Sequence, residues 1–158
     1  MPLRYRDKRI RTYKVYNGKK EQIMIRRLIC SIRNGGCGRI HNELPDILVA
    51  YKHYASEVIE NVIDGVSTPY DLTSEDYPCE ITMKQRWPAW ISANHDIFEA
   101  AARQINSQSE ECCVSASDDG PSGFSVLRRK GPGWLPKLLK AIYNSGGRTY
   151  PAKERSDK

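Results

Sequence analysis

The chain of 158 residues carries 25 Lys and Arg against 19 Asp and Glu, for a net charge of +6 and a pI near 9.1. This length predicts one domain, and the basic balance favours a polyanionic partner. No stretch approaches the roughly 18 apolar residues of a membrane span, and the charged start of the chain is not a secretory signal, so we expect a cytoplasmic protein with no membrane partner. It has none of the motifs GxSxG, HExxH, GxGxxG or Walker A, so we do not expect an enzyme.

The charge is unevenly spread along the chain. Residues 1–30 have a net charge of +8 and residues 128–158 a net charge of +7, whereas residues 43–80 have a net charge of −8. The basic ends either bind phosphates or neutralise the acidic middle within the fold, and we favour phosphate binding.

The first predicted element is a β-hairpin. Residues 7–16 and 21–29 are rich in β-branched and basic side chains, and Asn17-Gly18 between them is typical of a type I′ turn. The basic side chains either mark a solvated sheet edge or form a ribbon that lies along a phosphate backbone. The candidate DNA contacts on the hairpin are Arg9, Arg11, Lys14, Arg26 and Arg27.

A Cys- and Gly-rich knuckle follows the hairpin. It places Cys30, Cys37 and His41 within twelve residues, around a turn that Gly35-Gly36 permits. Thiolate and imidazole are zinc ligands, so zinc is the predicted cofactor. A fourth ligand would come from Cys79, His53 or Cys112. Alternatively, the cysteines are small apolar side chains that pack in a tight turn.

Helices are predicted after a strap at 43–54. Ser56 is the expected N-cap of a helix over 56–64, whose apolar stripe is Val58, Ile59, Val62 and Ile63. A second helix covers 79–91, with Ile81, Trp87 and Trp90 towards the core, and must kink or restart near Pro88. A third covers 93–105.

The polar residues of the second helix suggest DNA reading. Helix 56–64, or an extra short helix at 70–77, would pair with 79–87 as a helix-turn-helix. The residues predicted to contact bases are Thr82, Lys84, Gln85 and Arg86. Alternatively, these helices are a plain core with a solvated polar face.

The C-terminal part is predicted to hold a loop at 107–125 and a basic turn at 128–133. A last helix begins at Trp134 and ends before Gly146. The basic turn adds three candidate DNA contacts, Arg128, Arg129 and Lys130.

We therefore expect an α+β protein in which the hairpin and knuckle pack on a small helix-turn-helix-like bundle. Its predicted segments are 1–45, the hairpin and knuckle; 46–106, the helix-turn-helix-like region; 107–132, an acidic and Gly-rich loop; and 133–158, the last helix and a basic tail.

Three blocks of the sequence resemble a family of bacterial mobile-element proteins frequent in Firmicutes. They are RRLICxxxxxxCGRIHNELPDILVAYKHYASEVIENVIDG (residues 26–65), ITMKQRWPAW (81–90) and GWLPKLLKAIYNSG (133–146). The resemblance implies a zinc-ribbon-type hairpin, a transposase-type helix-turn-helix with residues 81–87 as its recognition helix, and DNA binding. The family usually has a CxxC pair ahead of the hairpin, which this sequence lacks.

The predicted function is duplex-DNA binding in a bacterial mobile element. The alternative is a phage- or element-encoded inhibitor, for example one similar to an anti-CRISPR protein, which would bind a host nucleoprotein or nuclease. The sequence leaves open the DNA site, the oligomeric state and the identity of any protein partner.

Overall fold

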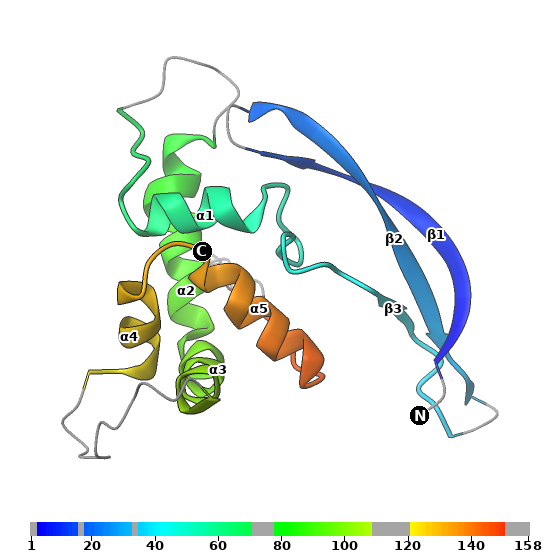
Figure 1. Ribbon diagram of the computed structural model, residues 1–158. Helices are drawn as coiled ribbons and strands as arrows, with labels where there is room; N and C mark the ends of the chain where they lie inside the picture. Colours follow the sequence, from blue (N-terminus) through cyan, green and yellow to red (C-terminus); the bar gives the residue numbers. More distant parts are fainter. Residues whose placement is uncertain (1–2, 16–17, 33–34, 71–77, 109–120, 151–158) are drawn as a thin grey trace, which may run out of the picture.

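A computed structural model describes residues 3–15, 18–32, 35–70, 78–108 and 121–150. Within these ranges a three-stranded antiparallel sheet precedes five α-helices, so the predicted α+β class is confirmed. Figure 1 shows the sheet curving along one side of the helices, with the N-terminus and β3 at the end away from them. The elements are β1 (Leu3–Lys14), β2 (Lys20–Cys30), β3 (Ile40–Asn42), α1 (Ser56–Ile63), the π-helix η3 (Thr82–Arg86), α2 (Trp87–Ala93), α3 (His95–Gln108), α4 (Gly123–Arg129) and α5 (Trp134–Asn144).

The predicted hairpin is confirmed as the long antiparallel pair β1–β2. Its register places Ile10 opposite Met24 and Arg11 opposite Ile23. Of the predicted turn, Gly18 has the expected positive φ of 68°, whereas Asn17 lies outside the described residues. Because β3 pairs only with the end of β2, β1 is an edge strand up to Lys14, which forms an isolated bridge with Tyr54.

The two faces of the hairpin differ because side chains alternate along each strand. We call the solvent side the outer face; its residues are Lys8, Ile10, Thr12, Lys14, Lys20, Gln22, Met24 and Arg26. The inner face holds Asp7, Arg9, Arg11, Tyr13, Glu21, Ile23, Ile25 and Arg27. Tyr13 and Ile25 are buried, so the inner face is the one that meets the rest of the protein.

The predicted strap crosses the turn end of the hairpin. Leu48 and Val49 are fully buried in the core. The backbone N–H of Ala55 donates to the carbonyl of Lys14 at 2.9 Å, and that of Lys14 donates to the carbonyl of His53 at 2.7 Å. These bonds join the start of α1 to the end of β1.

Aromatic side chains fill the core between the helices. Trp87 and Trp90 are buried as predicted, and Trp90 meets Phe98 edge to face at 5.4 Å between ring centroids. Trp134 meets Phe124 in the same way at 5.3 Å. The predicted apolar stripes of the helices at 56–64 and 134–144 face this core.

Ile81 was predicted to face the core, but it is 56% exposed. The segment that follows it is a π-helix, in which the N–H of Trp87 donates to the carbonyl of Thr82, five residues back. Pro88 then stands in the first turn of α2, where its missing N–H costs nothing. The predicted restart near Pro88 is confirmed, and the wider turn before it changes which side chains point inward, so Met83 is buried.

The start of α1 differs from the prediction. Ala55 is the N-cap, and Ser56 is buried as the first helical residue with no capping bond from its side chain. The described part of the chain instead stabilises two helix starts with distant glutamates. Glu60 is buried and accepts hydrogen bonds from the N–H groups of Gly133 and Leu135, where α5 begins.

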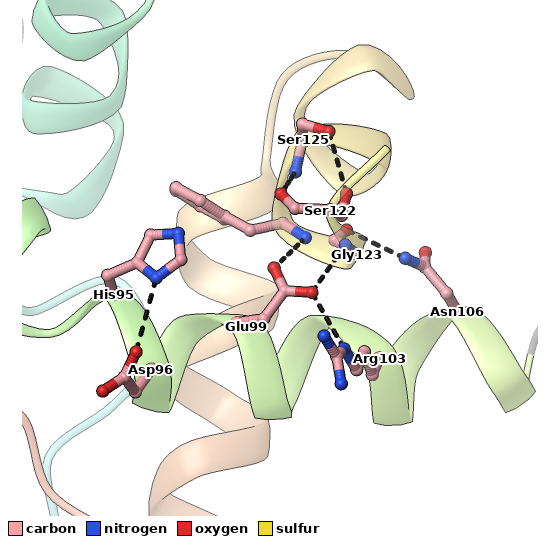
Figure 2. A network of polar contacts seen from close by, with 9 residues as sticks. His95, Asp96, Glu99, Arg103, Asn106, Ser122, Gly123 and Ser125 are labelled. Carbon is pink, nitrogen blue, oxygen red and sulfur yellow. Dashed lines mark hydrogen bonds and ion pairs between the residues drawn. The ribbon is translucent and has the colours of Figure 1, made fainter. Parts of the chain in front are cut away.

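Glu99 plays the same part for α4 (Figure 2). Its carboxylate accepts from the N–H of Gly123 at 2.8 Å and of Phe124 at 3.0 Å, and from Arg103 at 2.9 Å. Burial alone would raise the pKa of Glu99, but these donors outweigh it and lower the pKa to about 2. The interaction fixes α4 against α3.

The predicted loop and basic turn are wrong in part, because α4 occupies residues 123–129. The side chain of Ser122 caps this helix by accepting from the N–H of Ser125. Arg128 and Arg129 form its last turn rather than a loop. The rest of the predicted loop, 109–120, lies outside the described residues.

Candidate functional site

The knuckle brings its three predicted ligands together at the far end of the hairpin. Ligand atoms of Cys30, Cys37 and His41 all lie within 4.8 Å of one another. Cys30 is buried at the end of β2, and its sulfur accepts from the N–H of Cys37 at 3.3 Å. The Cys37 sulfur lies 3.6 Å from Nε2 of His41, which stands on β3. Side chains from the end of β2, from the turn that follows it and from β3 therefore meet in one cluster.

This group has the chemistry of a metal site. The backbone N–H of Arg39 and the side chain of His41 lower the pKa of the Cys37 thiol to about 7, which favours the thiolate that binds metal. Two ligands of a tetrahedral zinc ion stand roughly 3.5 Å apart, since each is about 2.0–2.3 Å from the metal. The separation of Cys37 Sγ and His41 Nε2, 3.6 Å, fits that spacing. The group could hold a metal ion.

Two predicted fourth ligands are excluded by the fold. His53 bonds to Lys14 through its carbonyl, at the turn end of the hairpin, whereas the register places Cys30 opposite Leu3. The eleven residues between these ends span roughly 35 Å. Cys79 bonds to Thr82 at the start of η3 rather than to the knuckle. Cys112, the third candidate, lies outside the described residues.

Arg11 and Arg128, two predicted DNA contacts, are turned towards the protein itself. Arg11 donates to the carbonyls of Val49 at 2.9 Å and Lys52 at 2.7 Å, and burial lowers its pKa. Arg128 binds Asp64 at 2.5 Å. Each guanidinium is already occupied in holding the fold together, so we leave both out of the DNA surface proposed below.

Two arginines of β2 differ in availability. Arg27 lies on the inner face in a two-bond pair with Asp7, at 2.6 and 2.5 Å, which lowers the pKa of that carboxyl. Arg26 lies on the outer face and pairs with Glu43 at 2.5 Å, but both side chains are largely exposed. An exposed pair of this kind is worth little, so Arg26 can exchange Glu43 for another anion.

The remaining predicted contacts are exposed or half-buried. Arg9, Arg129 and Lys130 are exposed, whereas Lys14 is half-buried beside the ring of Tyr54. They lie on several elements and do not form one cluster.

The predicted recognition helix presents most of its polar side chains. Lys84, Gln85 and Arg86 are exposed, whereas Thr82 is half-buried. Lys84 donates to Glu80 at 2.6 Å and to the hydroxyl of Tyr70 at 3.1 Å, so it is partly occupied. Gln85 and Arg86 are the more available pair.

The helix-turn-helix arrangement itself is not evident in the described residues. Helix α1 packs mainly on α5 and only lightly on α2, so it does not act as the first helix of such a motif. The other predicted partner, a helix at 70–77, lies almost entirely outside the described residues. The polar side chains of η3 are thus exposed without the predicted framework.

The sequence analysis named Lys14 and Arg26 as DNA contacts but did not separate the outer face of the hairpin from the inner face. The outer face holds four basic side chains, and none of its eight residues is acidic. The two acids of the hairpin strands, Asp7 and Glu21, both lie on the inner face. The sequence contains a sign of this separation. Side chains alternate along a strand, and Asp7 and Glu21 are in step with Tyr13 and Ile25, which are buried, so the two acids fall on the inner face.

The fold and site define an α+β protein with a basic hairpin that carries a Cys-Cys-His group. Residues 1–87 match a family model described as a domain of unknown function, DUF6431, and the chain belongs to this family. The match covers the hairpin, the knuckle, α1 and η3 and ends at the first residue of α2.

No curated protein and no solved structure matches the chain. Among the described helices, none combines the length and apolar character needed to cross a lipid bilayer.

Proposed function

We propose that the protein binds duplex DNA, and that the outer face of the hairpin makes the main phosphate contacts. The observation that carries this proposal is the separation of charge between the two faces. Lys8, Lys14, Lys20 and Arg26 lie on the outer face, whereas Asp7 and Glu21 lie on the inner face. An anion that approaches the outer face therefore meets these cations directly, because the carboxylates of the two strands lie on the other side of the hairpin.

The shape of the hairpin suits the same ligand. A two-stranded ribbon can enter a groove of B-form DNA, and its long edges can lie beside the phosphates. Cations along both strands would replace the counterions condensed on the duplex, and their release drives binding. Phosphate contacts position the protein but do not read sequence.

Base contacts are assigned in this proposal to the exposed side chains of η3. Arg86 can donate to guanine and Gln85 can make a paired contact with adenine. Both are exposed, and Arg86 carries its charge beside the partly occupied Lys84. The origin in a bacterial mobile element, and with it a cytoplasmic site of action, rests on the resemblance of residues 26–65, 81–90 and 133–146 to mobile-element proteins.

Zinc is the metal we propose for the knuckle. Cys30, Cys37 and His41 would hold it, and the described residues supply these three ligands. The ion would tie the end of β2 to β3 and to the turn between them, and would stiffen the end of the ribbon that stands away from the helices (Figure 1). A stiff ribbon loses less conformational entropy when it binds.

The test is duplex binding by charge variants of two surfaces. Lys8→Gln/Lys20→Gln removes two charges from the outer face, and Lys137→Gln/Lys140→Gln removes two exposed charges from α5. We expect fluorescence anisotropy with a labelled duplex to show a loss of roughly tenfold or more for the first variant and much less for the second. Equal losses would contradict the assignment of the surface. Absence of duplex binding by the unmodified protein would contradict the function and favour a protein partner.

A further inference from the structure

An exposed apolar pair stands in the middle of the basic outer face. Ile10 and Met24 lie directly opposite each other in the β1–β2 register, and each is 57% exposed. Directly paired side chains in an antiparallel ribbon have Cβ atoms about 4.5–5.5 Å apart, so the two form one apolar surface. The protein thus keeps two large apolar side chains in water in the middle of its longest strands.

Polar and basic pairs surround this apolar pair along the ribbon. Lys8 and Arg26 form the next pair on one side, and Thr12 and Gln22 the next pair on the other. The next residues in line are Lys14 and Lys20. Along its length, the outer face therefore carries a pair of cations, an apolar pair, a hydrogen-bonding pair and a second pair of cations.

This order argues against a second copy of the same face as the partner. Two outer faces packed against each other would bring together the cations of both copies, and the one carboxylate bound to each face, that of Glu43, already pairs with Arg26. Like charges placed directly opposite each other are destabilising. A partner that is anionic at its edges and apolar between them fits better.

Duplex DNA has this composition, with phosphates along the rims of each groove and base edges and stacked rings between them. Proteins that bend DNA from the minor groove often insert Ile, Met or similar side chains between base steps, while cationic side chains contact the flanking phosphates. We propose that the Ile10–Met24 pair enters a groove of the duplex and unstacks a base step while the flanking cations bind phosphates. This inference rests on the proposed DNA binding and adds its mode, which is deformation of the duplex by an apolar wedge.

The test compares the full chain with an Ile10→Thr/Met24→Thr variant. Threonine has the β-branched shape that strands favour, and at both positions it removes most of the apolar surface. The matched control is Val66→Thr, an exposed apolar residue outside the hairpin. The probe is a duplex of about 20 base pairs with 2-aminopurine at a central TA step, which is the kind of step that deforms most easily. End labels on the same duplex report bending by energy transfer.

For the unmodified chain and for Val66→Thr, we expect 2-aminopurine fluorescence to rise and the ends to approach on binding. For Ile10→Thr/Met24→Thr, we expect both signals to be lost and affinity to fall roughly tenfold, with the salt dependence unchanged because the phosphate contacts remain. Urea unfolding of each variant establishes that both sites tolerate threonine.

Two results would overturn the wedge. If Ile10→Thr/Met24→Thr binds and deforms the duplex like the unmodified chain, the apolar pair does not enter the groove, and the proposed DNA binding survives. If the unmodified chain binds vesicles of anionic lipid but not the duplex, the apolar pair belongs to a membrane contact, and the wedge and the proposed function fail together.

Discussion

The guanidinium of Arg11 holds the carbonyl oxygen of Val49, with Nη2 2.9 Å from that oxygen. The same nitrogen lies 2.7 Å from the carbonyl oxygen of Lys52. Val49 is fully buried in the strap, so these bonds join the inner face of the hairpin to the core. A basic residue of the hairpin therefore serves the fold, and its guanidinium is not available to a ligand.

Substituting Arg11 should destabilise the protein. We expect Arg11→Met to lower the free energy of unfolding by about 1–3 kcal/mol, because the carbonyls of Val49 and Lys52 lose the guanidinium, and within the described residues only that of Val49 keeps another donor, the N–H of Lys52. Urea unfolding measures this loss. Arg9→Met is the control, since Arg9 lies on the same strand and face but is exposed, and its effect should stay within about 0.5 kcal/mol. Equal losses for both would show that the bonds to the strap contribute nothing.

Glu60 should stabilise the start of α5. Its carboxylate accepts from the N–H groups of Gly133 and Leu135, where the helix carries partial positive charge. We expect Glu60→Gln to lower the free energy of unfolding, measured with urea, by about 1–2 kcal/mol. The substitution removes the negative charge, and the NH2 group of glutamine cannot accept a hydrogen bond from either backbone N–H. Glu57→Gln, an exposed change in the same helix, should cost far less. An equal cost for the two would contradict the capping role.

Glu99 should make stability depend on pH in the acid range. Its pKa is lowered from the usual 4.5 to about 2, so the folded state favours the ionised form. The stabilisation, about 2–3 kcal/mol, is present above pH 4.5 and is lost as the pH falls through about 2. Unfolding of the unmodified chain and of Glu99→Gln should therefore differ most near neutral pH and converge in acid. Asp96→Asn, an exposed change in the same helix, should show no such convergence. A constant gap for Glu99→Gln across this range would refute the role of its charge.

Metal binding should depend on the knuckle and not on Cys79. We expect elemental analysis to find about one zinc per chain, and Cys37→Ser or His41→Ala to abolish it. Cys79→Ser is the matched control because Cys79 is also an exposed free thiol but lies outside the ligand group. A chelator should lower the melting temperature of the unmodified chain. Zinc content well below one per chain, or an equal loss with Cys79→Ser, would exclude the site.

The parts of the fold that the sequence predicted well are those with a strong local period. The alternation of the hairpin and the helical stripe of Leu135, Leu138, Leu139 and Ile142 each bury one face, so pattern and structure agree. Helix α4 was missed because it is only seven residues long and its start depends on Glu99, 24 residues earlier. A contact at that separation leaves no local pattern.

The sequence predicted which residues form the candidate metal site, but it did not predict which basic side chains of the hairpin share one surface. Cys30, Cys37 and His41 are close in sequence, so a tight turn sufficed to bring them together. Whether an arginine faces a phosphate or the protein depends on acceptors far along the chain, as Arg11 with Val49 and Arg128 with Asp64 demonstrate. The side-chain alternation that separates the two faces of the hairpin was available in the sequence, and it would have excluded Arg11.

The salt dependence of duplex binding tests the central claim most directly. Four cations on the outer face that replace condensed counterions predict a slope of about −3 to −4 in a plot of log K against log salt concentration. Lys8→Gln/Lys20→Gln should reduce the magnitude of that slope by about two, whereas Lys137→Gln/Lys140→Gln should leave it nearly unchanged. A flat plot for the unmodified chain, or the same slope after the loss of Lys8 and Lys20, would contradict the account.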